Sequence, residues 1–462
     1  MVRVITQETF DEVVKENVEE FDMTPEEAIK DAVEQFEAQG VDLSNIVKDL
    51  AINELQNDEQ QSLVQVITNI RDLLKKEDPS PELAQQFTIL TDECNKSLAH
   101  KILAAKNGAY TLTLTALEKY SSNVDIVSPA LNAITSLMTG QPDLLNEKGI
   151  KLMMDYLDTQ SSVAVLGQVL KWTKQCCLKH EKNRQDIFKS NILGRLEKLL
   201  EHEKASSPVI RHACAVIRAL VLDDDVRVEY GNAHEHARMM AQAVLCTLTD
   251  LLKKFRGDAE TASDLILTLA TLVVRKEFCD KVEEAGGVTF LMDVLANYSM
   301  NEKLIRLSLK LLKALTGSDD VKDKIIKAGA APLITNAMYM YRKSADLTAA
   351  GCACIAALSL RSPENSRVLC AAGAAEVVVE GMKAHPDDAD VQKQGSTAVR
   401  NIVSRSRDLC KGFLELGAED VLNSALTKHK GKCEFEVKGA LRDLGCDVKL
   451  TESWSGKHGA LH

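Results

Sequence analysis

The sequence predicts an all-α fold, a right-handed solenoid of stacked helical repeats that follows an acidic helical N-terminal segment. A glycine placed before an apolar run recurs with a period in the low forties. Sustained alternation of apolar and polar residues, the mark of strands, is missing, and only 4% of the residues are aromatic. A period of this length is typical of helical repeat proteins, in which each repeat packs on its neighbours to build one continuous core.

The recurring glycines define the repeat. Successive members lie 41, 43, 44 and 44 residues apart where consecutive repeats can be followed. The gap of 137 residues after Gly149 spans three repeats, and Asn191 takes the glycine's place in one of them. Because Gly and Asn tolerate a left-handed backbone, we expect each to end one helix and let the next begin at once. The six glycines are Gly108, Gly149, Gly286, Gly329, Gly373 and Gly417.

A further helix start in each repeat is marked by serine and proline. The pairs Ser128–Pro129 and Ser207–Pro208 precede apolar runs, and we expect the serine to cap a helix whose first position is proline. Each repeat then has three helices with a corner between the first two. About eight such repeats fill residues 83–448, although the one near Gln242 has no turn residue at its corner. This plan resembles the armadillo-repeat family, which implies a right-handed superhelix.

The negative charge of the chain belongs to its first 98 residues. They hold 23 Asp and Glu against 8 Lys and Arg, a net charge of −15, whereas the whole chain carries −12, so the remainder carries +3. An acidic segment at a solenoid end serves as a polar cap or meets a basic surface. Thr24 and Glu27 around Pro25 predict a capping box at one of its helices. We expect an acidic helical segment over 1–50, a capping helix over 51–82 and a polar tail over 449–462.

Composition argues against several classes of function. The sequence lacks a run of 18 apolar residues and an apolar stretch after its N-terminus, so we expect neither a membrane span nor a signal peptide. The 12 scattered cysteines fit a reducing compartment. We expect a cytoplasmic protein, and the nucleus stays open as a second location. The acidic total argues against nucleic acid as the partner.

Motifs for catalysis are sparse. The patterns G-x-x-x-x-G-K-[ST] and G-x-S-x-G are both absent. A metal-dependent enzyme is the alternative class, and it would rest on His234, Glu235 and His236, which follow the acidic run 223–225. Residues two positions apart do not share a helix face, so a polar insertion in a degenerate repeat is the preferred interpretation. We therefore expect no enzyme, no metal and no cofactor.

The third helices supply the candidate binding site. The armadillo resemblance implies that they line a concave groove, where family members such as importin-α and β-catenin hold extended peptides with a ladder of asparagines. In the aligned column of this chain, the asparagine occurs only at Asn401. The alternative function among binding proteins is an importin-like transport adaptor, and the missing asparagines argue against it. The aligned column consists of Ser136, Trp172, Ala219, Thr271, Ala314, Ala357, Asn401 and Asp443.

Basic and aromatic residues complete the predicted site. Arg275, Arg361 and Arg405 lie four residues beyond the column and would form a basic stripe on the same face. The alternative is three solvated arginines at helix C-termini. Trp172 is an anchor for a partner side chain or, equally, a packing residue between repeats. We predict a monomeric, non-enzymatic scaffold or adaptor that binds other proteins, acidic segments among them, at Asn401 and these residues.

Longer phrases make the resemblance more specific. The stretch 7–47, the phrase "DDDVRVEYGNAHEHA" (223–237) and the phrase "ALRDLGCDVKL" (440–450) are similar to the armadillo repeat-containing protein 6 family. The similarity runs nearly end to end. It implies an intracellular armadillo protein without established enzymatic activity, and it implies that the insertion around 223–240 is a trait of the family.

Overall fold

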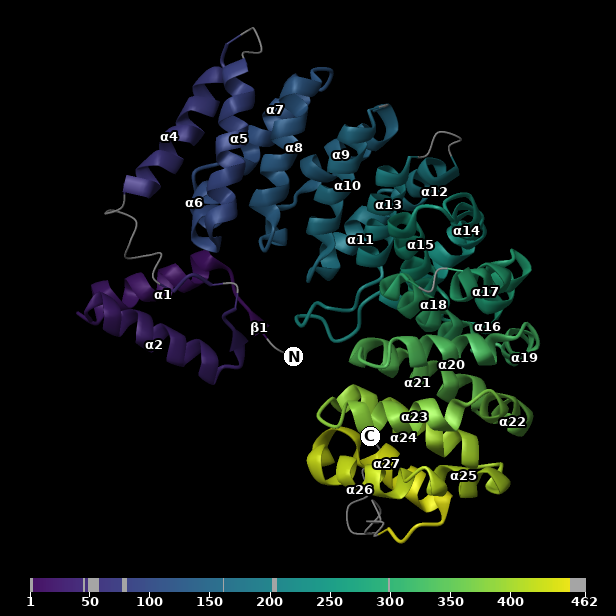
Figure 1. Cartoon of the computed structure of the whole chain (residues 1–462). Coiled ribbons are helices and arrows are strands. Elements are labelled where there is room, and N and C mark those ends of the chain that lie inside the picture. Colours follow the sequence, from purple (N-terminus) through teal and green to yellow (C-terminus); the bar gives the residue numbers. More distant parts are fainter. Residues whose placement is uncertain are drawn as a thin grey trace. The chain divides into compact units, whose positions relative to one another are not determined.

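A computed structural model describes residues 3–448 of the protein (Figure 1). The chain forms two compact units, an N-terminal one that ends at Ala243 and a C-terminal one that begins at Val244. Among the described residues, no helix combines the length and the apolar character that a membrane crossing requires. The description omits residue 45, residues 49–57 and 77–80, residue 161, and residues 202–205 and 298–299.

The N-terminal unit begins with a pair of helices that share a core of their own. In this pair, α1 (Gln7–Glu20) packs on α2 (Pro25–Ala38), and the rings of Phe10 and Phe36 lie 6.0 Å apart. The predicted capping box is confirmed, because the Thr24 hydroxyl accepts from the Glu27 N–H while the Glu27 carboxylate accepts from the Thr24 N–H at 3.1 Å. The acidic segment is therefore a folded element around a small apolar core, with most of its charged residues exposed and Asp11 buried beside Lys106 at 2.7 Å.

Two short strands close this segment. The strands β1 (Arg3–Val4) and β2 (Val41–Asp42) pair in parallel, with Arg3 opposite Val41. The apolar pattern does not reveal them, because two residues are too few for an alternation to be recognised. Gly40 precedes β2 with a φ of +71°, and the main-chain N–H of Arg3 donates to its carbonyl oxygen at 3.3 Å.

The rest of the N-terminal unit follows the three-helix plan. Its third helices α5, α8, α10 and α13 pack on one another in chain order. First and second helices stand between them, and one first helix is reduced to the 3-10 turn η1. The elements are α4 (Asp58–Leu73), α5 (Pro81–Lys96), α6 (Leu98–Lys106), α7 (Ala109–Lys119), α8 (Val124–Met138), η1 (Pro142–Leu144), α9 (Glu147–Thr159), α10 (Val163–Cys177), α11 (Glu181–Lys189), α12 (Ile192–Glu201), α13 (Ser207–Leu220) and α14 (Ala233–Lys254), which crosses the division.

The C-terminal unit repeats the plan more regularly. The third helices α15, α18, α21, α24 and α27 again pack in chain order. The elements are α15 (Ala259–Leu272), α16 (Lys276–Glu284), α17 (Gly287–Asn297), α18 (Glu302–Leu315), α19 (Asp319–Lys327), α20 (Ala330–Met340), α21 (Ala345–Ser359), α22 (Pro363–Ala371), α23 (Ala374–Ala384), α24 (Ala389–Val403), η2 (Arg407–Leu409), α25 (Cys410–Glu415), α26 (Ala418–Lys428) and α27 (Lys430–Leu444).

The corners between first and second helices are left-handed, as predicted. Gly329 and Gly373 have φ values of 84° and 89° and cap the helices that follow them. The same conformation occurs at Asn191, with a φ of 61°. It also occurs at three further glycines of the set, which are Gly108, Gly286 and Gly417.

Gly149 is the exception, and the predicted corner there is wrong. It lies buried in the first turn of α9, whose cap is Asn146. A Cβ at this position would lie 2.3 Å from the hydroxyl oxygen of Tyr110. The glycine is thus required by a close side-chain approach and not by a turn, two causes that look alike in a sequence.

Two other helix boundaries differ from expectation. Pro129 lies inside α8, which starts earlier because Asn123 caps it, whereas Pro208 does lie in the first turn of α13. The repeat near Gln242 has no corner residue because α14 runs straight through that position. Its first helix is replaced by the non-helical segment 221–232.

The corner glycines can be tested at Gly329, where a Cβ would meet nothing within 4 Å. Gly329→Ala should lower the free energy of unfolding by about 1–2 kcal/mol, because only the left-handed backbone opposes the methyl group. Gly412→Ala is the matched control, since Gly412 also has open space but lies in α25 with ordinary helical dihedrals. It should be neutral or mildly stabilising. Urea unfolding followed by circular dichroism measures both, and equal shifts would contradict the assignment.

Candidate interaction surface on the third helices

The three predicted arginines do not lie on the third helices. The helices α15, α21 and α24 end two or three residues before Arg275, Arg361 and Arg405. The four-residue spacing therefore does not apply, and the predicted stripe along one helix face is wrong. All three side chains are exposed in the links that follow the helices, and Arg275 lies 3.8 Å from Glu277. Their place matches the alternative, cations near helix C-termini.

Asn401 does lie on a third helix. It is half-buried on α24, and its amide nitrogen donates to the carbonyl oxygen of Ala356 on α21 at 2.9 Å. The asparagine therefore joins two neighbouring third helices. One of its N–H groups is used within the protein.

Trp172 lies in the core of the N-terminal unit. Its side chain is fully buried on α10, and its indole N–H donates to the sulfur of Met138 on α8 at 3.1 Å. A thioether is a weak acceptor, but it satisfies a donor that has no access to water. An indole without exposed surface offers nothing to a partner, so the anchor hypothesis is wrong. Trp172 is a packing residue between repeats.

The structure instead places basic side chains on the third helices themselves. Lys310 and Lys313 are exposed on α18, and neither has an ion-pair partner among the residues that the structure describes. Arg306, one turn earlier on the same face, lies 3.3 Å from Asp346. Lys393 and Arg400 hold related positions on α24. We call these five residues, together with Arg442 on α27, the basic third-helix face.

Small residues and an exposed aromatic ring accompany the basic third-helix face. Between α18 and α24, the intervening α21 carries mainly small residues, with Ala349 and Ala357 half-buried at its surface. On α27, Phe435 is 73% exposed, and the guanidinium of Arg400 lies 5.2 Å from the centre of its ring. Phe435 therefore has the exposure that Trp172 lacks.

Sequence reasoning missed these residues although the aligned column pointed to them. One position before Ala314, Asn401 and Asp443 stand Lys313, Arg400 and Arg442. These three column residues lie close to the C-terminal ends of their helices. The residue before each of them is still helical, whereas the residue four positions later lies beyond the end of the helix. The sequence therefore contained three of the basic residues of this face one position before the column, where the helix still continues.

The insertion around 223–240 holds no metal-binding arrangement. His236 is buried and stacks on Phe188, with ring centres 4.0 Å apart, and burial lowers its pKa. Glu235 pairs with Arg238 at 2.5 Å, and His234 is exposed. Within the described ranges, no group of three or more His, Cys, Asp or Glu residues could hold a metal ion.

The segment 221–232 is held by a buried ionic network. The fully buried guanidinium of Arg184 donates to Glu181 at 2.9 Å, to Asp224 at 2.5 Å and to the carbonyl oxygen of Cys177 at 2.8 Å. Asp225 accepts from the main-chain N–H of Glu181 at 2.7 Å and from Arg227 at 2.7 Å. The insertion therefore has one defined conformation.

Asp225 shows the strength of this network. Burial alone would raise its pKa, but the hydrogen bonds from Arg227 and from the main chain outweigh burial and lower the pKa to about 2. Each of these bonds favours the charged carboxylate. The segment therefore depends on Asp225 staying ionised.

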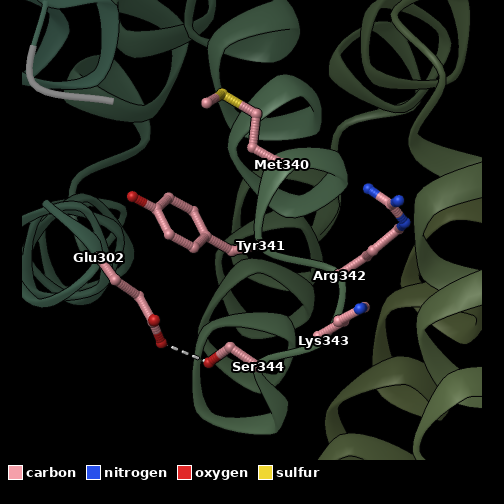
Figure 2. A pocket seen from close by; sticks show the side chains of 6 residues that line it. All are labelled: Glu302, Met340, Tyr341, Arg342, Lys343 and Ser344. Atoms are coloured by element: carbon pink, nitrogen blue, oxygen red, sulfur yellow. Dashed lines mark hydrogen bonds between the residues drawn. The ribbon is translucent and has the colours of Figure 1, made fainter. Parts of the chain in front are cut away.

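Several hollows lie outside the basic third-helix face. One of about 460 Å³ lies at the turn between α20 and α21, where Figure 2 shows the Ser344 hydroxyl joined to Glu302. That hydrogen bond measures 2.5 Å, and Ser344 also caps α21, so its hydroxyl has a structural use. Another, of about 920 Å³, lies in the N-terminal unit and is lined by acidic and basic side chains, among them His180, whose Nε2 lies 2.8 Å from Asp143. Neither arrangement resembles a nucleophile with its base.

Three-helix repeats with left-handed corners define an armadillo-repeat protein. A family model described as ARMC6 matches residues 63–462, and the armadillo repeat-containing protein 6 N-terminal domain matches residues 2–63. The chain belongs to the armadillo repeat-containing protein 6 family. It is 48% identical to the Drosophila melanogaster homolog over 99% of this chain and 98% of that one, and 45% identical to the Homo sapiens protein over 99% and 94%.

Solved structures agree on the fold. The crystal structure of an engineered protein matches with a TM-score of 0.66 at 17% identity, over 84% of this chain and 89% of that chain. A structure from work on the interaction between cadherin and β-catenin matches with a TM-score of 0.57 at 14% identity, over 82% and 68%. The predicted all-α armadillo solenoid and the predicted family are both confirmed.

The ionic network predicts a pH dependence. The folded pKa of Asp225 lies below its ordinary value of 3.8, so its stabilisation is complete above pH 4 and is lost as the pH falls towards 2. The loss should be about 1–2 kcal/mol. Thermal unfolding between pH 5 and pH 2 measures it, and Asp225→Asn should lose less stability over this window than the wild type.

The exposed carboxylate of Asp390 provides the matched control. Asp390→Asn should follow the wild-type curve throughout the acid range. If Asp225→Asn also followed that curve, the network would not depend on the charge of Asp225.

Proposed function

We propose that the protein is a non-enzymatic scaffold or adaptor that binds an acidic, extended segment of a partner protein on the basic third-helix face. An armadillo fold is commonly a protein-interaction scaffold, which supports the general class. The observation that carries the finer proposal is the exposed pair Lys310 and Lys313, which has no ion-pair partner among the described residues and lies on the same run of third helices as Arg400.

The spacing of the helices favours an extended occupant. Packed helices lie about 8–10 Å apart, so the three steps from α18 to α27 cover roughly 30 Å. An extended chain advances about 3.3 Å per residue, so about nine residues would reach from Lys310 to Phe435. A helix of the same length would cover only half that distance.

Charge and apolar contact have different parts in this proposal. Exposed ion pairs contribute only about 0.2–1 kcal/mol each and weaken with salt, so the lysines attract and orient the segment. Phe435 is the apolar anchor, because an exposed aromatic ring that already has a cation on one side can bury its other side against a partner.

Other properties of the chain fit this proposal. Burial raises the pKa of Cys352 and Cys354 to about 12, which keeps these thiols unreactive, and all twelve cysteines are free. These thiols support a cytoplasmic location, with the nucleus as the second one. We favour a partner in trans over the acidic N-terminal segment, because that segment is folded around its own core. We expect a monomer that does not bind nucleic acid.

The proposal predicts a loss of affinity on charge reversal. Lys310→Glu/Lys313→Glu should weaken binding of a fluorescent library of acidic peptides, about nine residues long with Asp, Glu and Leu at each position, by roughly tenfold. Fluorescence anisotropy measures the affinity. The wild-type affinity should also fall between about 50 mM and about 300 mM salt, as screening of exposed charges requires.

The control variant is Lys327→Glu/Lys411→Glu, which makes the same change in net charge on the first helices α19 and α25, at two exposed positions. It should bind like the wild type. If both double variants weakened binding equally, the attraction would come from net charge alone and the proposed face would be wrong.

A further inference from the structure

The C-terminal end of the basic third-helix face holds an arginine cluster built around one carboxylate. The side chain of Asp443 is 7% exposed, and Arg442 donates to it at 2.8 Å. Arg407 and Arg400 lie 3.8 and 3.9 Å from the same carboxylate. Arg407 also donates to the main-chain oxygen of Asp443. Three positive charges around one negative charge leave a formal excess of two.

Asp443 positions these arginines without using all their donors. A guanidinium has five N–H groups in a planar fork, and the cluster offers fifteen against two carboxylate oxygens and one carbonyl. The side chains of Arg407 and Arg442 are 59% and 50% exposed. Asp443 therefore holds the arginines in place, and many of their N–H groups remain exposed to solvent.

Arg400 is fixed from two further sides. Its guanidinium lies 5.2 Å from the ring centre of Phe435. A Cβ at Gly439 would lie 3.0 Å from the Cδ of Arg400, so the arginine crosses α27 in a space that the glycine leaves free. Preorganised side chains lose less entropy when a ligand binds, which favours a ligand with several acceptors.

We propose that Arg400, Arg407 and Arg442 bind a phosphoryl group, so that the partner segment is recognised in its phosphorylated form. This inference rests on the proposed function and names a subsite of the same face. A phosphorylated serine or threonine brings a charge of about −1.5 to −2 and three acceptor oxygens, which match an excess of two charges and more than one arginine fork. A single carboxylate of a partner would neutralise only one of the two excess charges. It would also leave most of the exposed N–H donors without an acceptor.

A phosphorylated protein segment fits this place better than a nucleic acid does. A nucleic acid presents a phosphate at every nucleotide and requires a continuous basic track. Glu434 and Glu436 flank Phe435 on α27, beside the cluster. Glu434 pairs with Lys438 at 2.6 Å and Glu436 with Lys393 at 3.6 Å, so the charges of these two lysines are already balanced and they do not extend a basic track from the cluster. A segment with one phosphoryl group needs only the arginine cluster itself.

The test compares two versions of one peptide library on the full chain. Both contain Asp, Glu and Leu at variable positions, with either phosphoserine or serine at the centre. The wild type should bind the phosphorylated version roughly tenfold more tightly. Arg407→Gln/Arg442→Gln should lose this ratio, whereas Lys310→Gln/Lys313→Gln, which removes the same charge elsewhere on the face, should weaken both libraries and keep the ratio.

A pH series supplies a second readout. The second pKa of a phosphoryl group is about 6, so the ratio should shrink as the pH falls below that value and the phosphoryl dianion gains a proton. Arg407→Gln alone serves if the double variant does not fold, because the Arg407 side chain is the most exposed of the three. Arg407→Lys should restore only part of the ratio, because a lysine keeps the charge without the fork.

The outcomes separate the two proposals. Equal binding of both libraries by the wild type would overturn the phosphoryl subsite and leave the proposed function standing. If neither library bound, the proposed function would fall and the subsite with it. If a single-stranded oligothymidylate bound more tightly than the phosphopeptides, and did so through the same arginines, the cluster would be a nucleic-acid contact.

Discussion

Within each unit, the structure depends on the packing of each third helix against its neighbours, with the inner ones buried between two others. A third helix is apolar on more than one side, so it cannot be stable until the adjacent repeats cover it. The second helices interlock with this stack. A Cβ at Gly351 would lie 2.5 Å from the Cγ of Met338, and a Cβ at Gly395 would lie 2.5 Å from the Cγ of Met382. The two glycines lie 44 residues apart, as do the two methionines, so the same contact occurs in successive repeats.

One repeat departs from this rule and uses a different interaction. Where a first helix should follow α13, the chain has the segment 221–232, and charged groups around Arg184 replace the apolar contacts of a helix. Burying an arginine is costly unless its charge is matched, and Glu181 and Asp224 provide the match. Breaking such a network is far more destabilising than its net contribution suggests, because one partner's loss leaves a buried charge. In the repeat after α13, which has no corner glycine, ion pairs therefore stabilise the segment that replaces the first helix.

Most of the fold was predictable because its signals are local. A left-handed corner demands Gly or Asn at one position, and a helix cap demands an oxygen at another, so Gly329, Asn191 and Thr24 could be assigned from their own neighbourhoods. Gly149 could not be, because its requirement comes from Tyr110, 39 residues earlier in the sequence. The candidate site was harder for the same reason. Whether Trp172 is buried, or whether a helix ends before Arg405, depends on contacts with other repeats.

The exposed residues of the third helices are where sequence can change without disturbing the stack. Lys310 and Thr397 occupy equivalent positions on α18 and α24, one exposed and one half-buried, and neither is needed to fill the core. Phe435 is different, because an aromatic ring that is 73% exposed adds little to folding and exposes apolar surface to water. Its contact with Arg400 offsets part of that cost. Folding alone leaves the rest of the cost unexplained, and this remainder supports the proposed role of Phe435 as the apolar anchor for a partner segment.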